Sequence, residues 1–461
     1  MSTTAEGVRP VGGVVSPARS GRWIDDWRPE DPVFWENTGA RVARRNLAFS
    51  IFSEHIGFSI WSMWSVIVLF LGPKYHIDPA GKFMLTTVPT LAGAVLRLPY
   101  TFAVAKFGGR NWTIVSAVTL LVPLAVTAVI LKPGVSYTTL IIVATLAGVG
   151  GGNFASSMTN INTLYPDRLK GRALGLNAGG GNLGVAAVQL VALLVLATAG
   201  KEHPRIILAI YLPLIVLSAL GAVLFMDNIS SARNDTHAMR DVARDGHTWV
   251  MSLLYIGTFG SFIGFGFAFG QVLQVQFKAD FSTPIKAAYL TFLGPLVGSL
   301  IRPVGGVLAD RLGGARVTFV NFVAMAASAG LVLAASRMGS LPLFITGFLL
   351  LFAFAGIGNG STYKMIPAIF RAKAVLAGGA DPAVDAEGAR EARRLSGALI
   401  GLAGAIGAFG GVLVNLAFRQ SFLTYKTGDG AYIAFLAFYA LCFVVTWAVY
   451  LRPSPRRLAG V

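Results

Sequence analysis

The sequence predicts an all-α membrane protein of twelve transmembrane helices, arranged as two six-helix pseudo-repeats with both termini in the cytoplasm. Three observations support this fold class. Hydrophobic residues make up 54% of the 461 residues and charged residues only 13%, whereas soluble domains typically carry about 25% charged residues. Apolar runs long enough to cross about 30 Å of hydrocarbon recur along the chain. The two halves also share motifs in the same order. This composition excludes soluble multidomain enzymes, disordered proteins and disulfide-rich secreted scaffolds.

The apolar runs give the predicted membrane spans in order. They cover residues 47–71, 82–105, 113–131, 138–162, 173–198, 206–226, 249–273, 287–309, 317–336, 341–366, 395–418 and 431–451. With a cytoplasmic N-terminus, 25 of the 38 lysines and arginines fall on the cytoplasmic side and 10 on the other. This bias predicts that both termini are cytoplasmic. The net charge of +17 therefore follows from topology, and we expect no nucleic-acid partner.

Polar segments divide the chain into five parts. A cytoplasmic N-terminal tail (1–46), which contains no apolar signal region, precedes the N-terminal six-helix bundle (47–226). A charged cytoplasmic linker (227–248) leads to the C-terminal six-helix bundle (249–451), and a cytoplasmic tail (452–461) follows. The polar segment 371–394 is predicted to form a surface helix.

Three motifs occur in both halves in the same order. RLPYTFAVAKFGGR from Arg97 aligns with RPVGGVLADRLGGA from Arg302 at an offset of 205. GVGGGNFASSM (from 148) resembles GIGNGSTYKMI (from 356) at an offset of 208, and GLNAGGGNLG (from 175) resembles GLAGAIGAFG (from 401) at an offset of 226. Parallel six-helix repeats are typical of one large class of secondary transporters, which bind substrate near the midplane between the repeats.

The motifs also resemble a known family. GGVLADRLGGARVT (305–318) resembles the signature loop between the second and third helix of each half in the major facilitator superfamily, and FAVAKFGGRNWT (102–113) resembles its degenerate copy. GGGNFASSMTNINTLYP (150–166), GRALGLNAGGGNLGV (171–185) and SGALIGLAGAIGAFGGV (396–412) are similar to its nitrate/nitrite porter family of NarK-type transporters, as are WRPEDPVFW (27–35) and SLLYIGTFGSFIGF (252–265). The resemblance implies a nitrate or nitrite transporter with site arginines at Arg97 and Arg302.

The residues themselves point to an anion site. Apart from Lys82 at the very start of a span, only Arg97, Arg302 and Lys364 among the basic residues fall within predicted spans, and Glu54 is the one acidic residue deep within a span. An arginine in a membrane helix costs about 2.5–3.5 kcal/mol to insert, so it commonly serves function. Its planar fork matches oxyanions in bidentate geometry. We therefore expect Arg97 and Arg302 to bind an anion; structural pairing with a carboxylate is the alternative.

Glycine-rich spans and asparagines fit a small anion. Small residues let membrane helices approach closely, which leaves a narrow cavity. Asn177 and Asn182 in the fifth helix could each donate an amide hydrogen bond to an anion, or could equally bond across helices. The glycine runs are not phosphate-binding P-loops, because no GK[ST] follows them.

Four aromatic residues are further candidates for substrate binding. Tyr255 and Phe259 lie four residues apart, and thus on one face of the seventh helix. By the resemblance, Phe58 and Phe154 match positions that flank the anion in the family. Without the resemblance, each of the four would be interpreted as core packing.

The remaining ionisable groups within the spans are candidates for proton coupling. Glu54 shares a helix face with Phe58, and the neighbouring His55 is the residue type that titrates near neutral pH. The alternative for Glu54 is a fixed ion pair with one of the basic residues within the spans. Lys364 either adds a third positive charge or pairs with Glu54. Asp310, Arg311 and Lys106 are expected at the cytoplasmic surface, where the loop motif holds the closed arrangement of helices.

The favoured function is secondary active transport of nitrate across a bacterial cytoplasmic membrane, by nitrate/proton symport with alternating access. Nitrate/nitrite antiport or nitrite export is the alternative, and a non-transporting anion sensor is a distant one. No Ser-His-Asp elbow or metal-ligand pattern occurs, so we expect no enzyme activity, no cofactor and no metal. The expected partners are nitrate, nitrite, protons and the lipid bilayer, with a functional monomer.

Overall fold

The computed structural model describes residues 22–231, 236–378, 382–453, 458 and 461. Within this part, twelve helical segments are long and apolar enough to cross a membrane, which confirms the predicted all-α membrane fold of twelve helices. The N-terminal half contains α1 (Pro32–Phe34), η1 (Trp35–Gly39), α2 (Ala40–Phe70), η2 (Pro73–Tyr75), α3 (Pro79–Phe107), α4 (Gly109–Thr119), α5 (Leu121–Ile130), α6 (Tyr137–Leu146), α7 (Val149–Leu164), α8 (Asp167–Thr198) and α9 (Arg205–Phe225).

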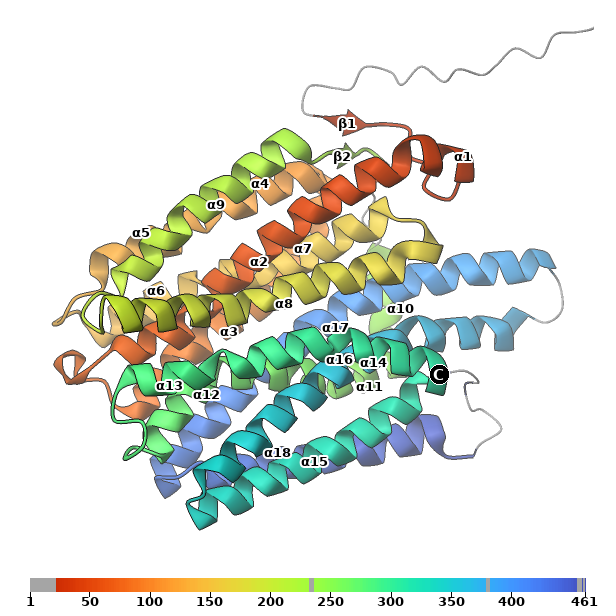
Figure 1. The fold of residues 1–461 in the computed structure, drawn as a ribbon. Helices are drawn as coiled ribbons and strands as arrows, with labels where there is room; N and C mark the ends of the chain where they lie inside the picture. The colour runs from red at the N-terminus through yellow and green to blue at the C-terminus, as the bar shows by residue number, and fades with distance from the viewer. Residues whose placement is uncertain (1–21, 232–235, 379–381, 454–457, 459–460) are drawn as a thin grey trace, which may run out of the picture.

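The C-terminal half follows the linker helix α10 (Thr236–Arg244). It contains α11 (Gly246–Tyr255), η3 (Ile256–Gly260), α12 (Ser261–Gln276), α13 (Pro284–Thr291), α14 (Leu293–Leu312), α15 (Gly314–Met338), α16 (Leu341–Gly378), α17 (Pro382–Tyr425), α18 (Asp429–Thr446) and η4 (Trp447–Leu451). Figure 1 shows the N-terminal helices, red to yellow, on one side of the molecule and the C-terminal helices, green to blue, on the other.

The first membrane helix begins earlier than its apolar run. Helix α1 starts at Pro32, and the helical path continues through η1 into α2. Asp31 caps the start, because its carboxylate accepts hydrogen bonds from the backbone N–H groups of Val33 and Phe34 at 2.9 and 3.2 Å. The predicted tail (1–46) thus includes a polar helical extension, which an apolar pattern cannot detect. Residues 1–21 of that tail lie outside the described residues.

A short two-stranded pairing joins the tail to the linker. Strand β1 (Trp23–Ile24) pairs in parallel with β2 (Asn228–Ile229). Beside it, the buried carboxylate of Asp227 accepts hydrogen bonds from Arg22 at 3.1 Å, from Arg45 at 2.6 Å and from Asn46 at 2.8 Å. These contacts fix the start of the linker against α2. Linker residues 232–235 lie outside the described part, as do residues 454–457 and 459–460 of the predicted C-terminal tail.

The polar segment 371–394 is not a separate surface helix. Its described residues continue α16 to Gly378 and begin α17 at Pro382, so both helices extend past their apolar spans; residues 379–381 are not described. Figure 1 shows the two extensions projecting side by side from one end of the bundle. Helix α10 lies against α17, with Arg394 donating to Asp241 at 3.1 Å. On the α16 extension, Lys373 pairs with Asp245, which follows α10.

The two halves end their second membrane helix in the same way. Gly108 after α3 and Gly313 after α14 have φ angles of +87° and +89°. A side chain rarely adopts this conformation, so glycine allows the sharp turn into the next helix. The equivalence agrees with the offset of 205 between the two loop motifs.

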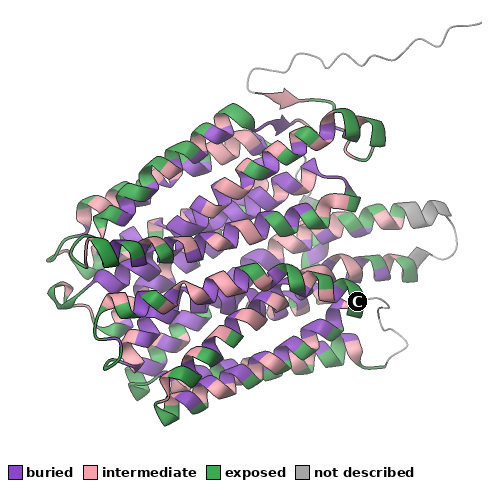
Figure 2. Cartoon of the chain, viewed as in Figure 1, coloured by how far each residue is buried: buried purple, intermediate pink, exposed green. Residues whose placement is uncertain are grey.

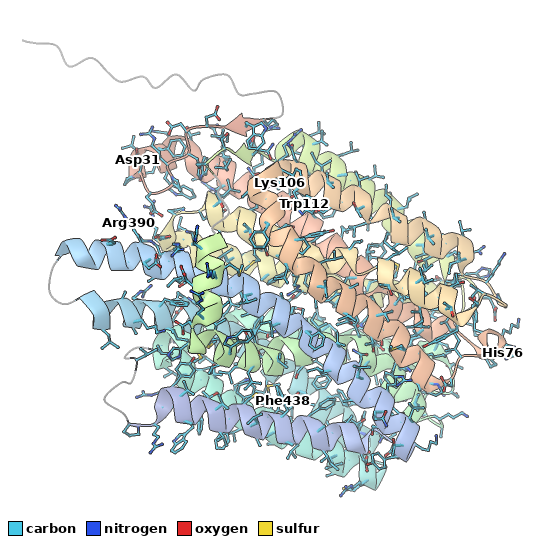
Figure 3. The ribbon with its side chains drawn as sticks, turned by 180° about the vertical axis from the view of Figure 1, so that it is seen from behind. Asp31, His76, Lys106, Trp112, Arg390 and Phe438 are labelled. Atoms are coloured by element: carbon cyan, nitrogen blue, oxygen red, sulfur yellow. The ribbon has the colours of Figure 1, made fainter. Side chains whose placement is uncertain are left out.

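The surface and the ends of the bundle suit a membrane protein. Figure 2 shows buried residues along the interior and exposed ones on the outer faces, and large apolar side chains such as Val129 (72% exposed) and Val320 (63%) lie outward. Lipid can cover such residues, whereas water cannot do so favourably. Figure 3 shows His76 at one end of the bundle, with Asp31, Lys106 and Arg390 toward the other.

Candidate functional site

Arg97 is held at the interface between the two halves. Its side chain is completely buried within α3. Nε donates to the carbonyl of Gly151 at 3.2 Å, and Nη1 donates across the interface to the carbonyl of Gly404 at 2.7 Å. Nη2 is buried without a hydrogen-bond partner. The guanidinium is therefore fixed in orientation while one donor nitrogen stays available.

Arg302 occupies the corresponding place on α14. It is buried (6% exposed), and its Nη2 lies 3.4 Å from the hydroxyl of Tyr255. Its Nη1 has no hydrogen-bond partner. None of the ion pairs between described residues includes Arg302 or Arg97. Both arginines thus keep a positive charge that no described carboxylate contacts, and such a pair favours an anion.

Aromatic rings connect the two arginines. The guanidinium carbon of Arg97 lies 4.5 Å from the ring centroid of Phe154 and 4.9 Å from that of Phe259, within cation–π range. Phe259 stacks on Tyr255 at 5.2 Å, and Tyr255 reaches Arg302. Phe58 borders Phe154 at 6.2 Å. The four aromatic residues named from the sequence therefore lie together, around and between the arginines.

Local backbone structure helps to position this stack. Tyr255 ends α11, and Phe259 lies in the π-helical turn η3; single π turns inside helices often occur at functional sites. Close packing of glycines fixes that turn, because a Cβ on Gly260 would lie only 2.6 Å from the Cα of Gly410 on α17. A side chain at Gly260 would push α17 away and widen the site.

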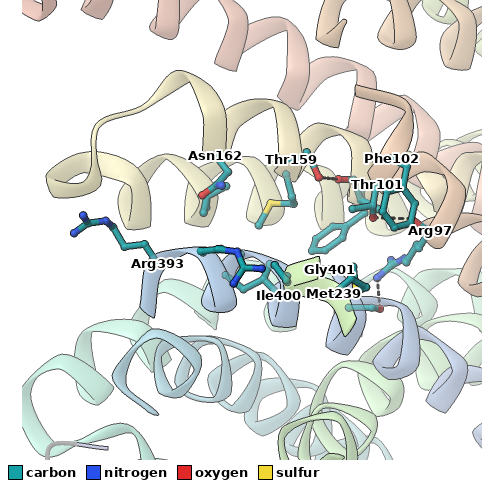
Figure 4. Close-up of a pocket in the computed structure, with 18 residues that line it drawn as sticks. Arg97, Thr101, Phe102, Thr159, Asn162, Met239, Arg393, Ile400 and Gly401 are labelled. Atoms are coloured by element: carbon teal, nitrogen blue, oxygen red, sulfur yellow. Dashed lines mark hydrogen bonds between the residues drawn. The ribbon is translucent and has the colours of Figure 1, made fainter. Parts of the chain in front are cut away.

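A cavity of about 220 Å³ leads away from Arg97 between the halves. Figure 4 shows Arg97 and Arg393 at opposite ends of the labelled lining residues. Parts of α3, α7 and α8 form one wall, and parts of α10 and α17 form the other. Arg393, whose side chain is 50% exposed, pairs across the two halves with Asp167 at 2.9 Å. The cavity therefore leads from Arg97 toward the end of the bundle that carries the linker.

The opposite end of the interface is packed. Thr86 donates to the amide oxygen of Asn415 at 2.8 Å, and Gln189 donates to the carbonyl of Gly266 at 2.7 Å. Phe83 stacks on Phe418 with centroids 5.8 Å apart. These contacts join the halves beyond the arginines, so the site is accessible from one side.

Glu54 lies in a separate polar cluster of the N-terminal half. Its carboxylate is 1% exposed and accepts hydrogen bonds from the Asn177 amide at 2.6 Å and from the Ser157 hydroxyl. Oε1 has no partner. None of the described ion pairs includes Glu54, so the alternative of a fixed ion pair is not observed. Arg97 and Arg302 are the charged groups near enough to act on it.

None of the three neighbouring candidates forms a described hydrogen bond with either arginine. Asn177 bonds to Glu54 and to Ser157, so it belongs to the Glu54 cluster. Nδ1 of His55 lies 3.1 Å from the carbonyl of Gly180 and faces the backbone of α8. Asn182 is buried, and both its amide atoms lack a partner, which leaves it available to an anion or a water molecule.

Lys364 does not pair with Glu54. Its Nζ contacts both carboxylate oxygens of Asp310 at 2.9 and 2.8 Å, and its side chain is 40% exposed. Lys364 therefore neither pairs with Glu54 nor adds an unpaired third positive charge, because its side chain reaches the carboxylate of Asp310 in the loop motif. Arg311 and Lys106 are exposed beside the two equivalent loops.

Three residues near the site were not identified from the sequence. The indole of Trp61 lies 5.5 Å from the Arg97 guanidinium. The guanidinium carbon of Arg302 lies 5.6 Å from the ring centroid of Tyr363. The hydroxyl of Tyr363 is buried without a hydrogen-bond partner. Ser157 binds Glu54. Helical spacing offered a signal, since Trp61 and Ser157 each follow a candidate phenylalanine by three residues. Among the described residues, no group of three or more His, Cys, Asp or Glu could hold a metal ion.

Comparisons with known proteins identify the family and the fold of the chain. The model of the Major Facilitator Superfamily matches residues 47–380. The nitrate/nitrite transporter NarU of Salmonella typhimurium is 39% identical, over 94% of this chain and 97% of the relative. The probable nitrate/nitrite antiporter NarK2 of Thermus thermophilus is 35% identical, over 95% and 98%. In fold, the chain is similar to the xylose transporter XylE from E. coli, with a TM-score of 0.65, 12% identity, and coverage of 90% and 99%.

Proposed function

This chain belongs to the major facilitator superfamily and, within it, to the nitrate/nitrite transporter family, and from this membership we propose that it carries nitrate inward across the cytoplasmic membrane together with protons. Its twelve candidate spans and its bacterial relatives make it a multi-pass protein of the inner membrane. We also propose that the predicted topology holds, with both termini and the linker (227–248) in the cytoplasm, and that one chain suffices for transport.

One observation carries the proposal: two buried arginines from the two halves each present a guanidinium nitrogen that has no partner. These are Nη2 of Arg97 and Nη1 of Arg302. Nitrate is planar and carries its charge on its oxygens, so two forked donors suit its edges. The rings of Phe154 and Phe259 offer flat surfaces for its faces. A neutral sugar would leave both charges uncompensated in a site that water barely reaches.

The placement of the arginines supports alternating access. Each half contributes one arginine, so movement of the halves changes both the grip on the anion and the side from which the site is reached. In this structure the cavity leads from Arg97 toward Arg393, on the side that the charge bias predicts to be cytoplasmic. The Arg393–Asp167 pair joins the halves at this end and has to open or shift as they move.

Protons supply the driving force in this proposal. Inward movement of nitrate against a negative-inside potential costs about 2.3 kcal/mol per charge per 100 mV. A carboxylate that takes up a proton compensates for that charge. Glu54 is suited to this role because it is buried, has no described ion-pair partner and is held by the neutral donors Ser157 and Asn177.

Exchange of nitrate for nitrite is the second candidate. The name of the Thermus relative includes antiport, and a Bacillus subtilis relative, 28% identical, is a nitrite extrusion protein. Exchange is electroneutral and requires no titratable group. In proteoliposomes loaded with nitrite at equal pH, both mechanisms support counterflow of labelled nitrate. Symport alone supports net nitrate uptake into anion-free vesicles when the outside is acidified. Failure of counterflow as well as uptake would reject nitrate transport altogether.

A further inference from the structure

Glu54 is separated from the cavity that serves the anion. The cavity lining includes Arg97 and Phe154 but neither Glu54 nor Arg302. The Glu54 side chain is 1% exposed, so the cavity does not reach it. If Glu54 carries the coupled proton, it needs a way to release that proton on the side where the cavity opens. The anion path does not offer one directly.

Polar side chains line the contact between α2 and α7 from Glu54 to the end of the bundle. On α2, Ser50 stands four residues before Glu54, on the same face and about 6 Å further along the axis. On α7, Ser157 and Asn160 stand three residues apart and share a face. All four side chains are buried, with exposures from 1 to 8%.

The register of the two helices places Ser50 level with Asn160. A Cβ on Gly57 would lie 3.0 Å from the Cγ of Asn153, and Glu54 contacts Ser157. The two helices therefore run antiparallel, and earlier residues of α2 lie beside later residues of α7. One more turn along both helices brings Ser50 opposite Asn160.

Unused hydrogen-bonding groups mark this contact. Oε1 of Glu54, Oγ of Ser50, Nδ2 of Asn160 and Oδ1 of Asn177 are all buried without a partner. Buried polar groups in proteins are normally satisfied, and ordered water is the usual partner where protein groups do not provide one. Asn160 reaches the end of the bundle, because a Cβ on Gly109 would lie 2.9 Å from its Nδ2, and Gly109 directly follows the loop after α3.

The C-terminal half acts as an internal control. Thr258 lies against Gly358 as Gly57 lies against Gly150. At the offset of 208 between the motifs of α7 and α16, Ser157 and Asn160 match Met365 and Ala368. Both are apolar. Close helix packing therefore does not require the polar residues of α7.

We propose that the side chains of Ser50, Ser157 and Asn160 form a water-bearing proton route between Glu54 and the linker end of the bundle, separate from the anion cavity. Protonated Glu54 gives its proton to water beside Ser50, becomes a carboxylate, and the proton leaves past Asn160. The charged groups that act on Glu54 are Arg97 from α3 and Arg302 from α14; both stabilise the carboxylate that release produces. His55, on α2 itself, faces Gly180. This inference rests on the proposed proton coupling.

The test uses an isosteric pair of variants in the full-length protein, reconstituted in proteoliposomes with a pH-sensitive dye inside. Ser50→Val removes the hydroxyl and Ser50→Thr keeps it in nearly the same shape. We expect Ser50→Val to slow acid-driven nitrate uptake and nitrate-dependent proton entry at least tenfold, with Ser50→Thr within about threefold of wild type. Nitrate/nitrite counterflow should stay within about twofold in both. Asn160→Leu should behave like Ser50→Val and gives a second reading if a Ser50 variant does not fold.

Ser62→Val is the matched control, since Ser62 is equally buried on α2 but lies on the other side of Glu54 and bonds to the carbonyl of Phe58. It should leave coupling unchanged. The route would be overturned if Ser50→Val and Ser50→Thr showed equal acid-driven nitrate uptake. It would also be overturned if Ser50→Val lowered acid-driven uptake and nitrate/nitrite counterflow to the same extent. Glu54→Gln in the same assay separates the two proposals. If the Glu54→Gln variant keeps acid-driven uptake, proton coupling at Glu54 itself is wrong. If Glu54→Gln loses acid-driven uptake but Ser50→Val keeps it, only the route is wrong.

Discussion

The guanidinium carbon of Arg97 lies 4.5 Å from the ring centroid of Phe154, and its Nη1 donates to the carbonyl of Gly404 in the other half. This arrangement fixes the arginine from two directions without neutralising it. Attraction to an aromatic face and to a carbonyl stabilises the cation, yet the unit charge remains for a ligand. The guanidinium is thus held in a fixed orientation while its charge stays available to a ligand.

The first prediction concerns the planar fork of the two arginines. Arg97→Lys and Arg302→Lys keep the charge but lose bidentate donation. We expect each to weaken nitrate binding at least tenfold, or about 1.4 kcal/mol, as measured by tryptophan fluorescence or calorimetry on purified protein. Arg316→Lys, at an exposed position, serves as control. Wild-type affinity in either site variant would contradict their role in gripping the anion.

The second prediction concerns the hydroxyl of Tyr255. Tyr255→Phe keeps the ring stacked on Phe259 but removes the group that lies 3.4 Å from Arg302. Loss of one hydrogen bond to a charged group costs about 1.5–3 kcal/mol when the charge is left without a partner. We expect nitrate KM to rise about tenfold and the apparent Tm to fall by a few degrees. An unchanged KM would mean that Tyr255 contributes packing alone.

The sequence predicted the charged centre of the site because its residues are anomalous where they stand. Arg97 and Arg302 interrupt apolar runs, and Tyr255 and Phe259 share a face by helical spacing. The partners of Glu54 were not predictable in this way. Ser157 and Asn177 meet it only because of the register between α2, α7 and α8, which no spacing within one helix encodes.

The boundaries of the helices were less predictable for a related reason. An apolar window reports where lipid surrounds a helix, and polar residues beyond that window can continue it. The first helix therefore begins at Pro32 rather than near residue 47. In the same way α16 runs to Gly378, beyond its apolar span. Lys364 lies within that span, yet its side chain contacts Asp310 and not Glu54.

The third prediction concerns that surface pair. Asp310→Asn removes the charge that holds Lys364, at positions 57% and 40% exposed. Exposed ion pairs contribute about 0–1 kcal/mol, so we expect little loss of stability. Turnover in counterflow should change severalfold, because the loop motif biases the arrangement of helices, while nitrate affinity changes less. Abolished nitrate binding in detergent would contradict this placement of the loop.

The fourth prediction concerns the close contact of α2 and α7. A Cβ on Gly150 would lie 3.0 Å from the carbonyl carbon of Gly57 and 3.1 Å from the backbone nitrogen of Trp61, so the backbone itself has to move. Overpacking of this kind costs about 1–3 kcal/mol. We expect Gly150→Ala to lower the apparent Tm by several degrees in a detergent thermal-shift assay. Gly175→Ala, where nothing lies within 4 Å, should leave Tm unchanged, and equal Tm values would refute the packing argument.

The central claim, that nitrate enters with a proton carried by Glu54, is tested most directly by Glu54→Gln in proteoliposomes. The amide keeps the shape and the hydrogen-bonding contacts of the side chain but cannot release a proton. We predict that acid-driven net nitrate uptake falls at least tenfold, while nitrate/nitrite counterflow at equal pH stays within about twofold of wild type. Acid-driven uptake equal to that of the wild type would contradict the account, and exchange of nitrate for nitrite would then be the better description of this transporter.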